Sequence, residues 1–156
     1  MNLVDIVVYV VILLFSVIVH EIAHALAALK RGDDTAQKLG RITLNPIPHL
    51  DLFGSIILPA IILITHIPIL FAWAKPVPIH PEKFKNPKRD IALVAFAGPL
   101  ANFTLAFVCS LINAVLIKLN LANSFIDVIH FLGIMIIINI SLGVINLIPI
   151  PPLDGS

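Results

Sequence analysis

The sequence has few charged residues, few aromatic residues and a single cysteine. Only 12% of its 156 residues are charged, about half the fraction of an ordinary soluble domain, and the mean hydropathy is +1.05. The lone cysteine, Cys109, excludes an internal disulfide. The net charge is +1, and no basic run is interleaved with aromatic residues, so a nucleic-acid partner is not expected. The composition predicts an integral membrane protein.

Four apolar runs are long enough to matter in a bilayer, whose hydrocarbon core needs about 20 helical residues. They cover residues 3–29, 52–74, 91–117 and 124–150. The loop at 30–51 contains "GRITLNPIPHLD", which has little helical periodicity and is expected to hold short extended or β-like segments. We therefore expect an all-α polytopic membrane protein with one domain, residues 1–156.

The positive charges indicate how the runs cross the membrane. Lys30 and Arg31 follow the first run, and the loop 75–90 carries five lysine or arginine residues, so both loops should be cytoplasmic. Two consecutive loops on one side make 52–74 a re-entrant or kinked segment, with three spanning helices elsewhere. The alternative is a plain transmembrane helix with a proline kink. Asp154 then lies on the same side as Lys30.

The motif "HEIAH" places His20, Glu21 and His24 inside the first apolar run. Helical residues four apart share a face, so His20 and His24 can bind one metal ion, and Glu21 is placed to act as a base. A catalytic zinc site has three protein ligands and one open position. Ionisable residues at this depth usually serve function. The alternative is a set of buried polar residues bonded to other helices.

A third ligand is expected from "NLIPIPPLDGS", where Asp154 follows a stretch with three prolines. Prolines forbid a regular helix, and unwound backbone at membrane depth is tolerated only against protein or a cavity. This segment, beginning at Asn146, therefore predicts a pocket wall that delivers the carboxylate. The alternative is a loop at the membrane surface with one solvated aspartate.

Other polar residues are weaker candidates. Asn102, in "AGPLAN", either points at the site or helps helices pack through the small residues around it. His49 and Asp51 either orient a ligand histidine or are solvated loop residues. Asn102, Asn146 and His49 are the candidates for contact with substrate, with a developing oxyanion or with a metal ligand.

The motifs "HEIAH", "GPLAN" and "NLIPIPPLDG" occur in the same order in the site-2 protease family of intramembrane zinc metalloproteases, which this chain resembles over nearly its whole length. The loop "LNPIPHLDLFGSIILP" followed by "WAKPVPI" is similar to the compact prokaryotic branch without a PDZ domain. The resemblance implies that His20, His24 and Asp154 bind one Zn²⁺ per chain and that Glu21 is the catalytic base. Family members normally continue beyond the DG motif, so the chain is expected to be a metalloprotease core truncated there.

The resemblance implies a zinc metalloendopeptidase that cuts peptide bonds in or near transmembrane segments, in regulated intramembrane proteolysis. Its partners would be a transmembrane protein substrate and the lipid bilayer, and an oligomer is not readable from the sequence. We expect a multi-pass protein of a prokaryotic cell membrane, with the site nearer the cytoplasmic side. The alternatives are a membrane metal-ion transporter, which needs ligands along a path, and an inactive zinc-binding scaffold, which needs no base at Glu21.

Overall fold

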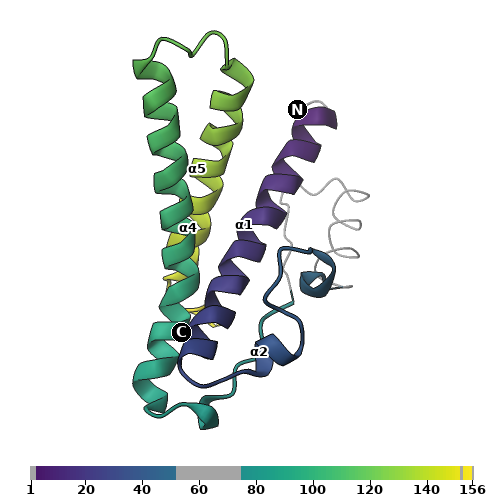
Figure 1. Ribbon diagram of the computed structural model, residues 1–156, viewed down its shortest axis with the longest axis vertical. Coiled ribbons are helices and arrows are strands. Elements are labelled where there is room, and N and C mark those ends of the chain that lie inside the picture. Colours follow the sequence, from purple (N-terminus) through teal and green to yellow (C-terminus); the bar gives the residue numbers. More distant parts are fainter. Residues whose placement is uncertain (1–2, 52–74, 152, 156) are drawn as a thin grey trace.

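Three long helices form the body of the molecule (Figure 1). The computed structural model describes residues 3–51, 75–151 and 153–155, and the segment 52–74, expected to re-enter or kink, lies outside this part. The long helices are α1 (Leu3–Lys30), α4 (Pro87–Lys118) and α5 (Ile126–Asn146). All three are long and apolar enough to cross a membrane. The expected all-α membrane architecture with three spanning helices is confirmed.

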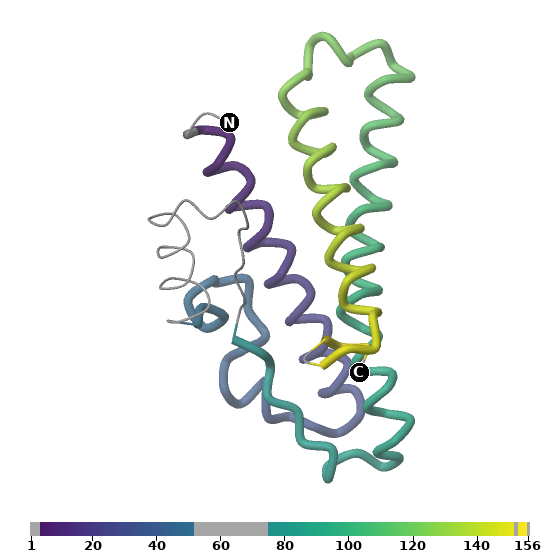
Figure 2. Tube along the Cα trace, turned by 180° about the vertical axis from the view of Figure 1, so that it is seen from behind, coloured from purple at the N-terminus to yellow at the C-terminus, as the bar shows by residue number. Residues whose placement is uncertain are grey.

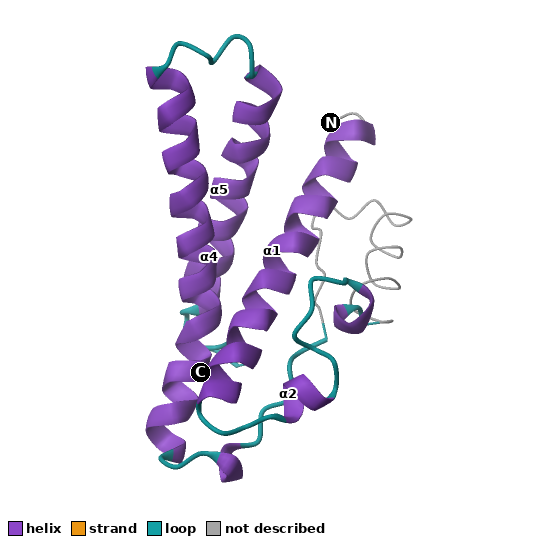
Figure 3. Cartoon of the chain, viewed as in Figure 1, coloured by secondary structure: helices purple, strands orange, loops and turns teal. Residues whose placement is uncertain are grey.

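The connections contain only short helical turns and irregular backbone. These turns are α2 (Thr35–Lys38), η1 (Ile47–His49) and η3 (Pro81–Lys83). Within the described ranges there is no strand, as Figure 3 shows. The loop after α1, where extended or β-like segments were expected, instead forms α2, several bends and η1. The prolines at 46 and 48 have no N–H to give to a strand ladder.

The helices pack through a small core that leaves many large apolar side chains outside. Helices α4 and α5 run antiparallel as a hairpin, and α1 lies across both (Figures 1 and 2). Ile12 of α1, Cys109 of α4 and Met135 of α5 belong to one buried cluster. By contrast, Phe107 and Ile137 are 69% and 68% exposed, as side chains facing lipid would be.

Polar contacts fix how the three helices sit against each other. Inside the bundle, the Asn139 amide donates a hydrogen bond to the Ser16 hydroxyl at 2.8 Å, and both side chains are fully buried. At the end of α1, Arg31 pairs with Asp90 in the first turn of α4 at 2.8 Å. The segment after α5 then turns back beside the C-terminal half of α1 (Figure 2). This return brings residues 130 positions apart into contact.

Candidate metal centre

The first two members of the site share one face of α1. His20 and His24 are both buried, and their Nε2 atoms lie 3.0 Å apart. This follows from the helical spacing, because side chains four residues apart lie one above the other. The helical spacing therefore brings two of the three ligand side chains together without any tertiary contact.

Asp154 reaches the same point from the other end of the described chain. Its Oδ2 lies 2.8 Å from His20 Nε2 and 3.2 Å from His24 Nε2. Helix α5 ends at Asn146, and the Gly155 N–H donates back to the Asn146 carbonyl at 2.8 Å, which closes the turn. A Cβ on Gly155 would lie only 2.6 Å from the Leu147 carbonyl oxygen, so the turn needs glycine there.

The donor set fits a zinc ion. His20, His24 and Asp154 each offer one ligand atom, and these three atoms lie within 4.8 Å of one another. Ligand atoms on one tetrahedral zinc stand about 3.3 Å apart, close to the separations of 2.8 to 3.2 Å found here. Two imidazoles and one carboxylate are also the ligand types that zinc accepts at a catalytic site.

The hydrogen bond on the far side of His24 supports the same assignment. His24 Nδ1 lies 2.7 Å from the backbone carbonyl of Val94, and a carbonyl can only accept, so Nδ1 is the nitrogen that donates. In a neutral imidazole, Nε2 then keeps its lone pair and faces the other two ligand atoms. Lone pairs that converge on one point repel each other unless a cation or a proton lies between them.

Charge in the site is also set by Asp154, which lies beyond the spanning helices. Burial raises the pKa of its carboxyl, but the adjacent His20 and His24 imidazoles outweigh this and hold the pKa well below its usual range. Asp154 is therefore an anion at neutral pH, as a metal ligand must be.

Gly98 of α4 closes the site from one side. A Cβ at this position would lie 2.3 Å from His24 Nε2 and 2.6 Å from His20 Nε2. Only a residue without a side chain lets the α4 backbone approach the ligand atoms this closely. The small residue that the sequence suggested for helix packing therefore lies directly against both imidazoles.

Glu21 lies beside the metal ligands and is held by backbone. Its Oε2 accepts a hydrogen bond from the Val77 N–H at 3.0 Å. Val77 belongs to residues 75–80, here called the crossing segment, which runs past this part of α1. Glu21, His24 and Asp154 line one cavity of about 220 Å³ together with this segment and α4. A carboxylate next to the metal ligands in a cavity has the placement of a general base.

One end of the crossing segment is fixed by a buried arginine. The Arg41 guanidinium donates to the carbonyls of Pro48, Lys75 and Pro76, and only 5% of the residue is exposed. The Lys75 N–H donates in turn to the His49 carbonyl at 2.9 Å. Arg41 therefore ties the loop after α1 to the backbone that carries Val77.

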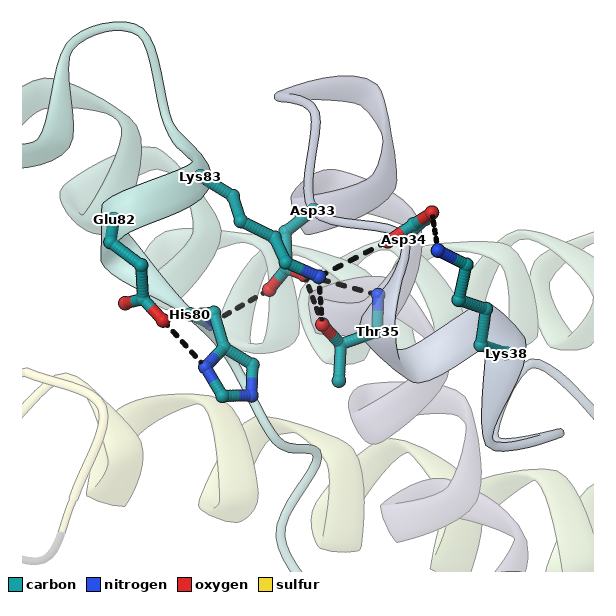
Figure 4. Close-up of polar contacts among 7 residues, drawn as sticks. All are labelled: Asp33, Asp34, Thr35, Lys38, His80, Glu82 and Lys83. Carbon is teal, nitrogen blue, oxygen red and sulfur yellow. Dashed lines mark hydrogen bonds and ion pairs between the residues drawn. The ribbon is translucent and has the colours of Figure 1, made fainter.

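The other end is fixed by Asp33, whose carboxylate is fully buried. Asp33 accepts hydrogen bonds from the His80 N–H at 2.7 Å and from Thr35, and it pairs with Lys83 at 3.2 Å (Figure 4). Burial raises the pKa of Asp33, but these donors outweigh it and lower the pKa to about 2. Asp33 is therefore a charged anchor for the crossing segment.

The remaining sequence candidates lie in different places. His49 is fully buried, and its Nε2 bonds to the Thr43 carbonyl at 2.9 Å, within its own loop. The Asn146 amide donates to the Leu142 carbonyl at 3.0 Å, one turn back in α5. Asn102 is fully buried, one turn after Gly98, and neither of its polar atoms has a hydrogen-bond partner in the part of the chain described. Among the described residues, His49 does not belong to the group of side chains that could hold a metal ion.

Sequence reasoning did not single out the groups that hold the site residues. Val94 and Val77 act through their backbone, which has no signature in the sequence. Asp33 and Arg41 are charged residues in loops, and their neighbours along the chain do not reveal their burial. Nothing in the sequence distinguishes them from the other charged residues of the loop 30–51.

Comparisons with known proteins agree with this geometry. The model of "Peptidase family M50" matches residues 115–156. "Putative zinc metalloprotease YwhC" of Bacillus subtilis is 43% identical over 150 residues, which cover 94% of this chain and 64% of the relative. "Putative zinc metalloprotease Rip2" of Mycolicibacterium smegmatis is 31% identical over 91% of this chain and 52% of the relative. The chain thus spans less than two thirds of either relative, and no solved structure gives a significant match.

Proposed function

Because the model of peptidase family M50 matches the C-terminal part of the chain and the relatives are named zinc metalloproteases, we propose that the chain belongs to this family, that of the site-2 proteases, and is an intramembrane zinc metalloendopeptidase. It would hydrolyse peptide bonds in or near transmembrane segments of other membrane proteins. The observation that carries the proposal is the convergence of His20, His24 and Asp154 beside Glu21, between helices that can cross a membrane. Relatives named zinc metalloproteases support zinc as the ion.

The chain's own residues have clear tasks in this reaction. His20, His24 and Asp154 would hold one zinc ion, which supplies Lewis-acid chemistry that polarises the scissile carbonyl and makes a water acidic. Glu21 takes a proton from the attacking water and then passes it to the nitrogen of the leaving amine. The Val77 N–H keeps one oxygen of Glu21 in place, and the other oxygen would make these proton transfers.

The substrate would be a transmembrane segment that unwinds locally, because a helix keeps its carbonyls in internal hydrogen bonds. We place the protein in a prokaryotic cell membrane with the site nearer the cytoplasmic face. The charge pattern supports this side, since Lys30 and Arg31 follow α1 and five further lysine or arginine residues precede or begin α4. The site lies near these ends of α1 and α4, because His24 is six residues before Lys30.

Zinc content per chain tests the proposal directly. Detergent-purified wild type should hold about one zinc, and Asp154→Ala should lose most of it because one of three protein ligands is gone. Asp127→Ala, at an exposed position in the first turn of α5, is the matched control and should keep its zinc. Glu21→Gln should keep zinc but lose cleavage of a transmembrane substrate. A zinc content that is unchanged in Asp154→Ala would refute the three-ligand centre.

A further inference from the structure

The cavity beside Glu21 has one charged or ligating side and otherwise apolar walls. Its polar residues are Glu21, His24 and Asp154, all of which already have a task in the proposed reaction. The other lining residues are all apolar: Pro76, Val77, Ile79, Ile91, Val94 and Ala95. Among the described residues that line the cavity, each charged or ligating one therefore already serves the proposed reaction. None of them is left to pair with a charged side chain of the substrate.

The walls come from two elements that are held firmly. Ile91, Val94 and Ala95 occupy one face of α4, since they are spaced by three and four residues. Val77 and Ile79 come from the crossing segment, and Val77 is 8% exposed, packed with Ala25 of α1. Anchors at both ends of this segment, described above, tie it to the loop after α1, and the Arg31–Asp90 pair ties the end of α1 to the start of α4. The width of the cavity is thus built into the fold.

The size and position of the cavity suit one side chain. Its volume is about 220 Å³, below the roughly 300 to 1,000 Å³ of pockets that enclose a whole small-molecule ligand. Glu21 must come within hydrogen-bond distance of the leaving nitrogen to protonate it. In the residue that carries this nitrogen, the side chain begins at Cβ, only two bonds away, so this side chain lies close to a cavity that Glu21 lines.

We propose that this cavity is the pocket for the substrate side chain on the amine side of the scissile bond and that it selects uncharged apolar side chains. The inference rests on the proposed function, because it assigns a specificity pocket to the same site. Ala95 sets the room available, since any larger residue there would extend from α4 into the cavity. Among the described residues, a charged side chain would meet Glu21, the metal ligands and apolar walls.

The test separates binding from cleavage. Transmembrane peptides that differ only at the amine-side residue (Gly, Ala, Val, Leu, Asp or Lys) are titrated against zinc-loaded Glu21→Gln protein in detergent, and dissociation constants are measured. The same peptides are then cleaved by protein with intact Glu21. Because each methylene in an apolar pocket changes discrimination about tenfold or more, the Leu peptide should bind at least tenfold more tightly than the Gly peptide, and the Asp and Lys peptides more weakly than either.

Ala95→Leu should remove this preference for Leu over Ala or reverse it, both in binding and in kcat/KM. Ala92→Leu adds the same side chain to the same helix at an exposed position outside the cavity, and it should leave the preference unchanged. An unchanged Leu-to-Ala ratio in Ala95→Leu, or a preference that follows the carbonyl-side residue, would overturn the pocket. Selective binding without any cleavage by intact protein would instead uphold the pocket and refute the proposed function.

Discussion

Replacing Gly98 with alanine should weaken metal binding while leaving the fold intact. The added Cβ would lie 2.3 Å from His24 Nε2 and 2.6 Å from His20 Nε2, whereas ordinary contacts of a Cβ lie at 3.4–4 Å. Each imidazole must therefore withdraw by about 1 Å. Metal sites tolerate changes of only about 0.2 Å in ligand distance. We expect zinc affinity to fall about 100-fold, the upper end of what disturbing the groups around a metal ligand costs.

The rings can withdraw because side chains rotate, but they cannot keep their present contacts when they do so. His24 would lose its hydrogen bond to the Val94 carbonyl, now 2.7 Å long, and both histidines would leave Asp154. Zinc affinity is measured by competition with a chromophoric chelator on detergent-purified protein. Circular dichroism and gel filtration of the same samples show whether the helical bundle has survived.

Gly133→Ala is the matched control for this prediction. Gly133 also lies inside a long helix, α5, and a Cβ there would meet nothing within 4 Å. Zinc affinity should stay at the wild-type value, and stability should rise by up to about 1 kcal/mol because alanine is the better helix former. If Gly98→Ala bound zinc within twofold of wild type, the close approach of α4 to the imidazoles would be refuted.

Three further changes test the parts that hold the site. Gly155→Ala should lower zinc affinity about tenfold or more, because its Cβ would meet the rigid Leu147 backbone at 2.6 Å and shift Asp154. Arg41→Lys should lower kcat about tenfold with zinc content unchanged, since an ammonium cannot bridge three carbonyls as a guanidinium does; an unchanged kcat would contradict this role. Asp33→Asn should cost about 2 kcal/mol of stability at pH 7, measured by denaturant unfolding, from a pKa lowered from 3.8 to about 2.

The Asp33 prediction has a definite pH dependence. The folded chain holds this pKa below the ordinary value of 3.8, so the carboxylate stabilises the fold fully above that pH. The contribution is lost as the pH falls from about 4 to about 2, where the carboxyl becomes protonated. The stability difference between wild type and Asp33→Asn should therefore shrink over this interval, and a difference that stays constant down to pH 2 would refute the anchor.

Much of the fold could be predicted because it depends on local chemistry. Runs of about 20 apolar residues must be helical in a bilayer, where each backbone group needs an internal partner. The spacing of His20 and His24 depends only on the helical repeat. The run of prolines before Asp154 indicated an unwound segment, and the helix does end at Asn146 before it.

The sequence alone thus determined the three apolar helices, the pair of histidines on one face and the carboxylate that could join them. Only the tertiary structure decided that Asp154 reaches both histidines, that Gly98 lies against them, and that the Val77 N–H holds Glu21. These facts depend on how α1 crosses α4 and on where the crossing segment is anchored by buried Asp33 and Arg41. Such contacts join residues far apart in the chain, and no local periodicity or propensity encodes the distance between them.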